Sequence, residues 1–116
     1  MLLTRTSQNA KLEHTHVISR RVLADFWRAH PDAQEPLAAW YQVAASVSWR
    51  SLSDVRATYP QADPVERLTV FNIGGNKYRL ITRIEYERQE VYIRNVLTHA
   101  EYDREDWKRD LWFRRS

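Results

Sequence analysis

The chain has 116 residues, which suits a single domain with a core of its own. Its 43% hydrophobic content and five Trp are typical of a folded protein, and its net charge of +3 is only mildly basic. The absence of Cys excludes disulfides and Cys-based zinc sites, and no apolar run approaches the ~20 residues of a membrane span. These features favour a cytoplasmic protein without a membrane segment.

The polar N-terminal residues show no hydrophobic period. We therefore expect a flexible N-terminal extension over residues 1–15 and a single domain over residues 16–116. Residues 16–18 suit a short strand. Ser19 has the character of an N-cap for a helix over residues 20–30, because Ser side chains accept hydrogen bonds from the first free N–H groups of a helix.

A second helix is predicted to begin at Pro36, a residue that suits the first turn, and to run to Val47 with apolar residues at helical spacing. Residues 51–59 suit one or two further helical turns, and residues 61–64 a loop.

Residues 68–73, 78–86 and 91–97 are rich in β-branched and aromatic residues, which indicates strands. The first two segments are separated by Gly74-Gly75-Asn76-Lys77, which contains both glycines of the chain. Gly and Asn accept the positive φ of tight hairpin turns. A phosphate-binding loop would instead need its glycines between a strand and a helix, with a following Lys-Ser/Thr step. The glycine pair therefore predicts a β-hairpin.

Alternation along a strand sends successive side chains to opposite faces of the sheet. If the loop at residues 87–89 has even length, one face is apolar and packs under the helices, with Val91, Ile93, Asn95 and Leu97 on it. The other face then carries Arg79, Arg83, Tyr92 and Arg94. Two interpretations of this second face stay open: a cationic, partly aromatic platform, and a solvated face with cross-strand charge pairs.

Thr98 and Glu101 have the spacing of a capping box, so a helix is predicted to begin after Thr98. His99 then lies in the first turn, where the helix dipole favours the neutral imidazole that a general base requires. Tyr102 lies three residues further on, on the same face. A His at a helix start more often serves packing or capping, so position alone does not make it catalytic. Trp107 and Leu111 are expected to dock this helix.

Taken together, FNIGGNKYRLITRIEYERQEVYIRNVLTHAEYD resembles the signature region of the HigB-type toxins of bacterial type II toxin–antitoxin systems, in the RelE-like superfamily. The resemblance covers about residues 16–107. It is most specific over residues 70–103, where GGN, YR, YIR and THxEYD occur in order. It implies an α+β fold in which N-terminal helices pack on a small, mostly antiparallel sheet with a C-terminal helix.

The resemblance also implies an activity, ribosome-dependent cleavage of mRNA, restrained by a HigA-type antitoxin with a helix-turn-helix domain. Its working residues include an arginine on the strand after the hairpin, which Arg79 matches, and residues near the end of the last strand, which His99 and Tyr102 match.

Such a cleavage needs a base for the 2′-OH, an acid for the leaving 5′ oxygen and fixed cations for the phosphorane, and no metal or other cofactor. We assign His99 as general base or acid, Arg79 as phosphate stabiliser, and Tyr102 to proton transfer or base stacking. The predicted RNA contacts are Lys77, Arg83, Tyr92 and Arg94.

Two other functions use the same residues. A non-catalytic module could grip RNA on the basic sheet face, or the face could receive a protein partner. A helix-turn-helix protein encoded by a neighbouring reading frame would favour the toxin over both.

Overall fold

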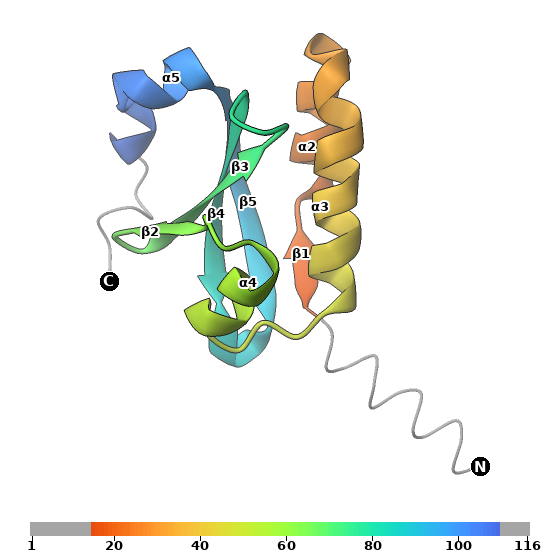
Figure 1. Cartoon of the computed structure of the whole chain (residues 1–116), viewed down its shortest axis with the longest axis vertical. Coiled ribbons are helices and arrows are strands. Elements are labelled where there is room, and N and C mark those ends of the chain that lie inside the picture. The colour runs from red at the N-terminus through yellow and green to blue at the C-terminus, as the bar shows by residue number, and fades with distance from the viewer. Residues whose placement is uncertain (1–14, 110–116) are drawn as a thin grey trace, which may run out of the picture.

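The computed structural model describes residues 15–109 of the chain. Its single sheet has the strand order β1-β5-β4-β3-β2 (Figure 1). The strands are β1 (His16–Ile18), β2 (Asp63–Val65), β3 (Leu68–Ile73), β4 (Tyr78–Glu85) and β5 (Glu90–Thr98). Strand β1 runs parallel to β5, and the other neighbours are antiparallel. The predicted α+β fold with a mostly antiparallel sheet is confirmed.

The helices lie on both faces of this sheet (Figure 1). Helices α2 (Arg20–Ala29) and α3 (Gln34–Ser46) pack on one face, α4 (Leu52–Thr58) lies near one end, and α5 (His99–Arg104) with the 3₁₀ turn η3 (Asp106–Arg109) lies on the other side. The helix predicted from Pro36 begins two residues earlier, directly after the 3₁₀ turn η1 (Pro31–Ala33). Within residues 15–109 no helix is long and apolar enough to cross a membrane.

The main core lies between the sheet and helices α2 and α3, and aromatic rings fill much of it. The ring of Phe71 in β3 stacks on Trp49 at 5.8 Å and meets Trp40 edge-on at 5.4 Å. Tyr59 contacts Phe71 from the segment after α4, at 5.5 Å. Packed rings of this kind fix the position of β3 and of the 59–62 segment relative to each other.

The predicted N-terminal extension lies outside the described residues, with the exception of Thr15. Thr15 is buried, its N–H donates to the Val47 carbonyl at 2.8 Å, and its hydroxyl accepts from the Trp49 N–H at 3.3 Å. Leu111, which was expected to help dock the last helix, also lies outside the described residues.

The glycine pair forms the predicted hairpin turn between β3 and β4. Gly74 and Gly75 have φ of 63° and 70°, values that residues with a Cβ rarely adopt. The Lys77 N–H donates to the Gly74 carbonyl at 3.3 Å, and Ile73 pairs with Tyr78 across the strands. This register places Asn72 directly opposite Arg79.

The two predicted helix caps have different outcomes. The capping box of α5 is confirmed: Thr98 Oγ1 accepts from the Glu101 N–H at 3.2 Å, and Glu101 Oε1 accepts from the Thr98 N–H at 2.9 Å. Ser19 does occupy the predicted N-cap position of α2, but the expected capping bond is absent, because its backbone is left-handed with φ of 74° and its side chain makes no capping hydrogen bond. Ser19 is the residue at which the chain passes from β1 into α2.

The loop predicted over residues 61–64 is partly wrong, because Asp63–Val65 forms the edge strand β2. Pro64 has no N–H to donate, and an edge strand is where a sheet accepts that loss. Strand β2 pairs with β3 only as far as Val70, so no described strand lies along the outer edge of residues 71–73.

The predicted partition of faces fails within β5. Ile81 pairs with Asn95 and Thr82 with Ile93, which makes Arg94 the additional residue of a β-bulge. A one-residue bulge exchanges the faces of everything beyond it. Val96 therefore joins the main core, whereas Asn95 and Leu97 lie on the opposite face with Arg79.

Candidate active site

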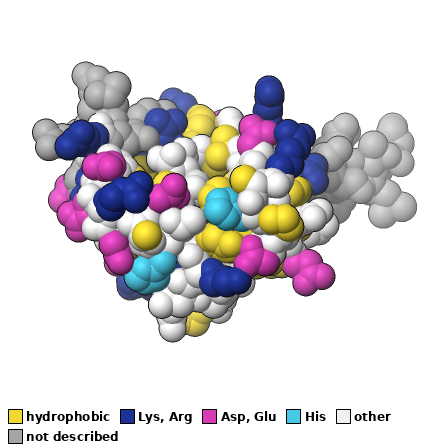
Figure 2. Space-filling model, turned by 90° about the horizontal axis from the view of Figure 1, so that it is seen from above, with side chains coloured by type: hydrophobic (Ala, Val, Ile, Leu, Met, Phe, Trp, Pro, Cys, Tyr) yellow, Lys and Arg dark blue, Asp and Glu magenta, His cyan; other side chains and the backbone are white. Residues whose placement is uncertain are grey.

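The face of the sheet opposite α2 and α3 is not the open cationic platform that one interpretation predicted. Leu68, Val70, Ile81 and Trp107 form a second buried cluster there, which Tyr102 and Leu97 extend. Figure 2 looks down on the upper end of Figure 1, where α5 and the β3–β4 turn lie, and shows acidic and basic side chains intermixed on that end. Whether each charged side chain can bind an anion therefore depends on its own hydrogen-bond and ion-pair partners.

Arg79 is buried, and the hairpin turn itself holds its guanidinium. Nη1 donates to the carbonyls of Asn76 and Tyr78, both at 3.2 Å, and Nη2 donates to Asn76 Oδ1 at 2.7 Å. None of these acceptors is a carboxylate, so the positive charge stays available to an anion. The turn that the glycines allow thus fixes an arginine without neutralising it.

Tyr102 connects Arg79 to the last turn of the described chain. The Arg79 guanidinium carbon lies 5.4 Å from the centre of the Tyr102 ring. The ring also stacks on Trp107 at 5.0 Å and 13°, and Trp107 Nε1 donates to the Tyr102 carbonyl at 3.0 Å. With these two neighbours on the ring, the hydroxyl is the group that Tyr102 can offer to a substrate, and the predicted alternative of base stacking is disfavoured.

Arg79 and Tyr102 line a pocket of about 370 Å³ that we call the cation pocket. Its other polar lining residues are Arg56, Gln61, Asp63 and Asn72. Arg56, at the end of α4, is tied into this wall because its Nε donates to the Ala62 carbonyl at 3.1 Å. Two arginines and one carboxylate give the lining a positive balance, which suits a phosphate group.

The pKa of the Tyr102 hydroxyl is raised above its usual value, first by burial and then by the negative charge of Asp63, against the opposing effect of Arg79. A raised pKa means that the hydroxyl holds its proton at neutral pH. The Tyr102 hydroxyl is therefore protonated at neutral pH, as that of an ordinary Tyr is, and it can act as a hydrogen-bond or proton donor but not as a base.

His99 lies one turn earlier on α5 and is not among the described residues that line the cation pocket. Its backbone N–H donates to the Lys77 carbonyl at 3.1 Å, which ties the start of α5 to the hairpin turn. The half-exposed imidazole has Nδ1 3.1 Å from Asp103 Oδ2. When Nδ1 carries the proton of this hydrogen bond, Nε2 of the neutral ring is a free acceptor.

The four predicted RNA contacts are dispersed over the sheet. Lys77, in the turn, forms an ion pair with Asp32, whose carboxylate also accepts from the Tyr78 hydroxyl. These two contacts, with Lys77 the stronger, lower the pKa of the Asp32 carboxyl. Lys77 therefore points toward the helix layer, on the opposite side of the turn from the bonds that hold Arg79.

Arg83 and Tyr92 are directly opposite each other on β4 and β5, four residues along β4 from Arg79. Arg83 Nε donates to Glu85 Oε2 at 2.8 Å, and Nη1 donates to the Arg67 carbonyl at 3.3 Å. The Tyr92 hydroxyl donates to Glu90 Oε1 at 2.8 Å, and this bond raises the pKa of Tyr92. The structure does not bring this pair to the cation pocket, and Arg94 lies apart from both groups in the bulge.

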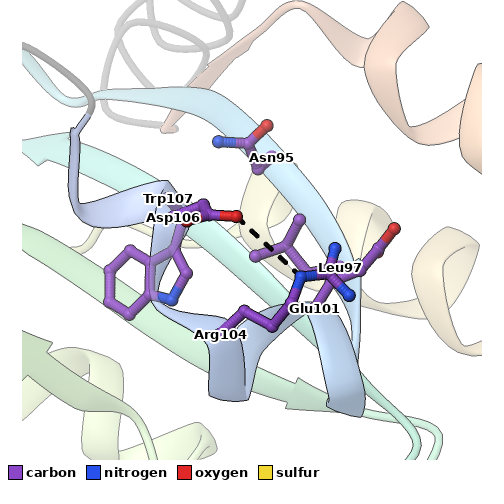
Figure 3. Close-up of a pocket in the computed structure, with 6 residues that line it drawn as sticks. All are labelled: Asn95, Leu97, Glu101, Arg104, Asp106 and Trp107. Atoms are coloured by element: carbon purple, nitrogen blue, oxygen red, sulfur yellow. Dashed lines mark ion pairs between the residues drawn. The ribbon is translucent and has the colours of Figure 1, made fainter.

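A second pocket, of about 380 Å³, lies beside Trp107 and is lined also by Asn95, Leu97 and Glu101 (Figure 3). Arg104 reaches from α5 toward Asp106, and the two side chains form an ion pair at 3.8 Å. Glu101 is committed to the capping box. The charges of this pocket therefore satisfy one another, unlike those of the cation pocket. In residues 15–109 no three His, Asp or Glu side chains cluster so that they could hold a metal ion.

Sequence reasoning missed four polar residues of the cation pocket: Arg56, Gln61, Asp63 and Asn72. Asn72 could have been found, because a four-residue turn that pairs Ile73 with Tyr78 puts Asn72 opposite Arg79. Arg56 and Gln61 come from a helix end and a connecting segment, where no sequence period reports the position in space.

Comparison with known proteins gives consistent matches. Residues 33–105 match the family HigB_toxin, described as the RelE-like toxic component of a toxin-antitoxin system. The mRNA interferase toxin HigB of Escherichia coli (strain K12) is 33% identical over 91 residues, 76% of this chain and 88% of the relative. The mRNA interferase HigB of Shigella flexneri matches with the same identity and coverage. That of Escherichia coli O6:H1 is 25% identical over 92 residues, 77% of this chain and 89% of the relative.

Proposed function

The chain belongs to the HigB family of RelE-like toxins of toxin–antitoxin systems, and we propose that it is an endoribonuclease that cleaves mRNA at the cation pocket. The observation that carries this placement is the Arg79 guanidinium, held by neutral acceptors and facing the pocket beside the Tyr102 ring. A fixed cation without a carboxylate partner is what a charged transition state requires.

The proposed reaction is attack of a ribose 2′ oxygen on the adjacent phosphorus. The bond from the 2′ oxygen to phosphorus forms, the bond from phosphorus to the 5′ oxygen breaks, and the products are a 2′,3′-cyclic phosphate and a 5′-hydroxyl. Arg79 and Arg56 stabilise the charge of the phosphorane, because both guanidinium groups belong to the pocket wall. The reaction proceeds through side chains alone.

Proton transfer divides between two residues of α5. Tyr102 is the proposed acid that protonates the leaving 5′ oxygen, because it lines the cation pocket beside Arg79 and its hydroxyl is protonated at neutral pH. His99 is the proposed base, because the Asp103 carboxylate orients Nδ1 and leaves Nε2 to accept the 2′ proton. For this step the RNA must pass from the cation pocket over the start of α5.

The partners follow from the same family. We propose that the substrate is mRNA on the ribosome in the cytoplasm, and that a HigA-type antitoxin with a helix-turn-helix domain restrains the toxin. Outside the pocket the proposed contacts with mRNA or ribosomal RNA are Lys77, Arg83, Tyr92 and Arg94. Because Lys77 and Arg83 are in ion pairs, an RNA phosphate would have to replace Asp32 or Glu85.

The experiment that tests this function is induced expression in bacteria with mapping of mRNA 5′ ends, followed by cleavage on purified ribosomes. Growth should stop, new 5′ ends should appear, and the antitoxin should reverse both effects. We expect His99→Ala to lower the cleavage rate by about 10²–10⁴-fold and to retain the melting temperature, because a proton-transfer group is lost from an exposed position.

His16→Ala, at an exposed position of β1, is the matched control and should cut at the parental rate. A folded His99→Ala protein that also cuts at the parental rate would remove His99 from the mechanism. Normal growth with soluble, folded protein and intact mRNA would leave a non-catalytic RNA-binding module as the better function.

A further inference from the structure

The cation pocket has a neighbour with a different chemical character. A pocket of about 300 Å³, which we call the aromatic pocket, is lined by Tyr59, Pro60, Phe71 and Gly75. Gln61 and Asn72 line both pockets, as do Pro60 and Ala62. The two pockets therefore share a wall, and a ligand of modest size can reach both.

The aromatic pocket has the properties of a site for one flat ring. Tyr59 is partly exposed, and its ring packs edge-on against the buried Phe71, on which Trp49 stacks, so this wall is formed before a ligand arrives. Gly75 contributes no side chain at the rim, and a Cβ there would meet no other atom within 4 Å, which leaves the entrance open. Apolar and aromatic walls of this kind bind nucleobases without regard to sequence.

The shared wall adds a hydrogen-bonding edge. Asn72 Nδ2 donates to Gln61 Oε1 at 3.0 Å, which fixes the two amides side by side at an exposed position. This bond leaves the amide nitrogen of Gln61 as a donor and the Asn72 Oδ1 as an acceptor. Among the described residues no other group is seen to bond to either atom. A neighbouring donor and acceptor match the edge of a nucleobase, and an amide side chain is a common reader of such edges.

The position of this wall relative to the arginine follows from the sheet. Asn72 is directly opposite Arg79 across β3 and β4, so the amide edge and the guanidinium lie on neighbouring strands. The outer edge of β3 at residues 71–73 has no described strand beside it, so the sheet does not close this side. One nucleotide can then place its base in the aromatic pocket and its phosphate in the cation pocket.

We propose that the two pockets together bind a single nucleotide of the substrate RNA, and that the Gln61–Asn72 amide pair selects its base. The proposal rests on the function proposed above, and it adds a base-reading subsite beside the cleavage chemistry. The pair is aligned because the hairpin register fixes Asn72 and because the segment that carries Gln61 is packed through Tyr59 on Phe71.

The test begins with binding alone, so that it does not depend on cleavage. The four nucleoside 5′-monophosphates and ribose 5-phosphate, which lacks a base, are titrated into the full chain and followed by NMR of the side-chain amides. We expect at least one nucleotide to shift the Gln61 and Asn72 amide signals and to bind more tightly than ribose 5-phosphate. Asn72→Ala should reduce the preference among bases by about 5- to 150-fold, the range of one good base contact.

Two further variants separate the subsites. Arg79→Ala should weaken binding of the nucleotides and of ribose 5-phosphate alike, because it removes the phosphate contact. Gln42→Ala changes an exposed amide on α3 in the same way as Asn72→Ala changes the amide of the wall, and it should bind as the parent does. In ribosomal cleavage of a randomised mRNA, Asn72→Ala and Gln61→Ala should flatten the base profile at one position.

The outcomes distinguish this inference from the function. Binding with base preference in a protein that does not cleave would overturn the function and keep the subsite. Cleavage together with equal binding of ribose 5-phosphate and all four nucleotides, or with no shift of the two amides at millimolar concentrations, would overturn the subsite. An unchanged cleavage profile in both amide variants would overturn it as well.

Discussion

Arg79 and Arg83 lie four residues apart on the same face of β4, about 13 Å along the strand, and their surroundings differ in one decisive respect. Arg79 is held by the neutral oxygens of Asn76 and Tyr78. Arg83 is held by the carboxylate of Glu85 and a backbone carbonyl. Hydrogen bonds hold both guanidinium groups, but that of Arg83 is paired with a carboxylate and that of Arg79 with neutral oxygens.

This comparison shows why a row of arginines is a poor guide to a site. Both residues are arginines, and alternation along β4 puts them on the same face of the sheet. The partner decides the chemistry, because a carboxylate offsets the positive charge whereas an amide only orients it. In Arg79 the orientation comes from a turn within three residues, so the site is preformed when the hairpin folds.

The largest effect is expected from Arg79→Ala, for which cleavage on purified ribosomes should fall by about 10²–10³-fold. Arg79→Lys should recover only part of the rate, since a point charge replaces a planar fork that donates in two directions. Binding to ribosomes, measured by pelleting, should change little.

The control for this experiment is Arg21→Ala, which removes an exposed arginine of α2 and should cut at the parental rate. If folded Arg79→Ala protein were as active as the parent, the cation pocket would not be the site of cleavage.

A smaller effect is expected at Asn76, which we interpret as the positioning residue of Arg79. Asn76→Ala removes the 2.7 Å bond to Nη2 and keeps the backbone bond to Nη1. The loss of one hydrogen bond to a charged group predicts a decrease of about tenfold in kcat. In an Arg79→Ala background the same change should have no further effect, which a double-mutant cycle measures. Independent, additive effects would assign Asn76 another role.

The sequence was a good guide where a local motif carries the structure. Gly74-Gly75 predicted the hairpin, and Thr98 with Glu101 predicted the start of α5, because a turn and a capping box involve neighbouring residues only. Together these two features bring Arg79 and Tyr102 to the same pocket.

Sequence reasoning failed where no local motif determines the position of a side chain. The bulge at Arg94 reversed the faces of Asn95 and Leu97, and no residue type in that stretch requires a bulge. Arg56 and Gln61 reach the site through packing of Tyr59 on Phe71, a contact between residues 12 positions apart in sequence whose geometry periodicity cannot report.

The smallest effect is expected from Arg83→Ala, the same substitution at the arginine that is paired with a carboxylate. The change removes the partly buried pair with Glu85 and the exposed bond to the Arg67 carbonyl, so we expect the free energy of unfolding to fall by about 1 kcal/mol. Because the guanidinium is bound to a carboxylate, it adds little to the electrostatic potential at a phosphate, and kcat should stay within about threefold of the parent.

If Arg83 contacts RNA as proposed, KM for Arg83→Ala should rise, and the dependence of KM on salt should weaken by about one phosphate contact. A kinetic series over salt concentration, beside a thermal melt, measures all three quantities. A fall in kcat as large as that of Arg79→Ala would mean that the carboxylate partner does not decide the role of an arginine on this strand.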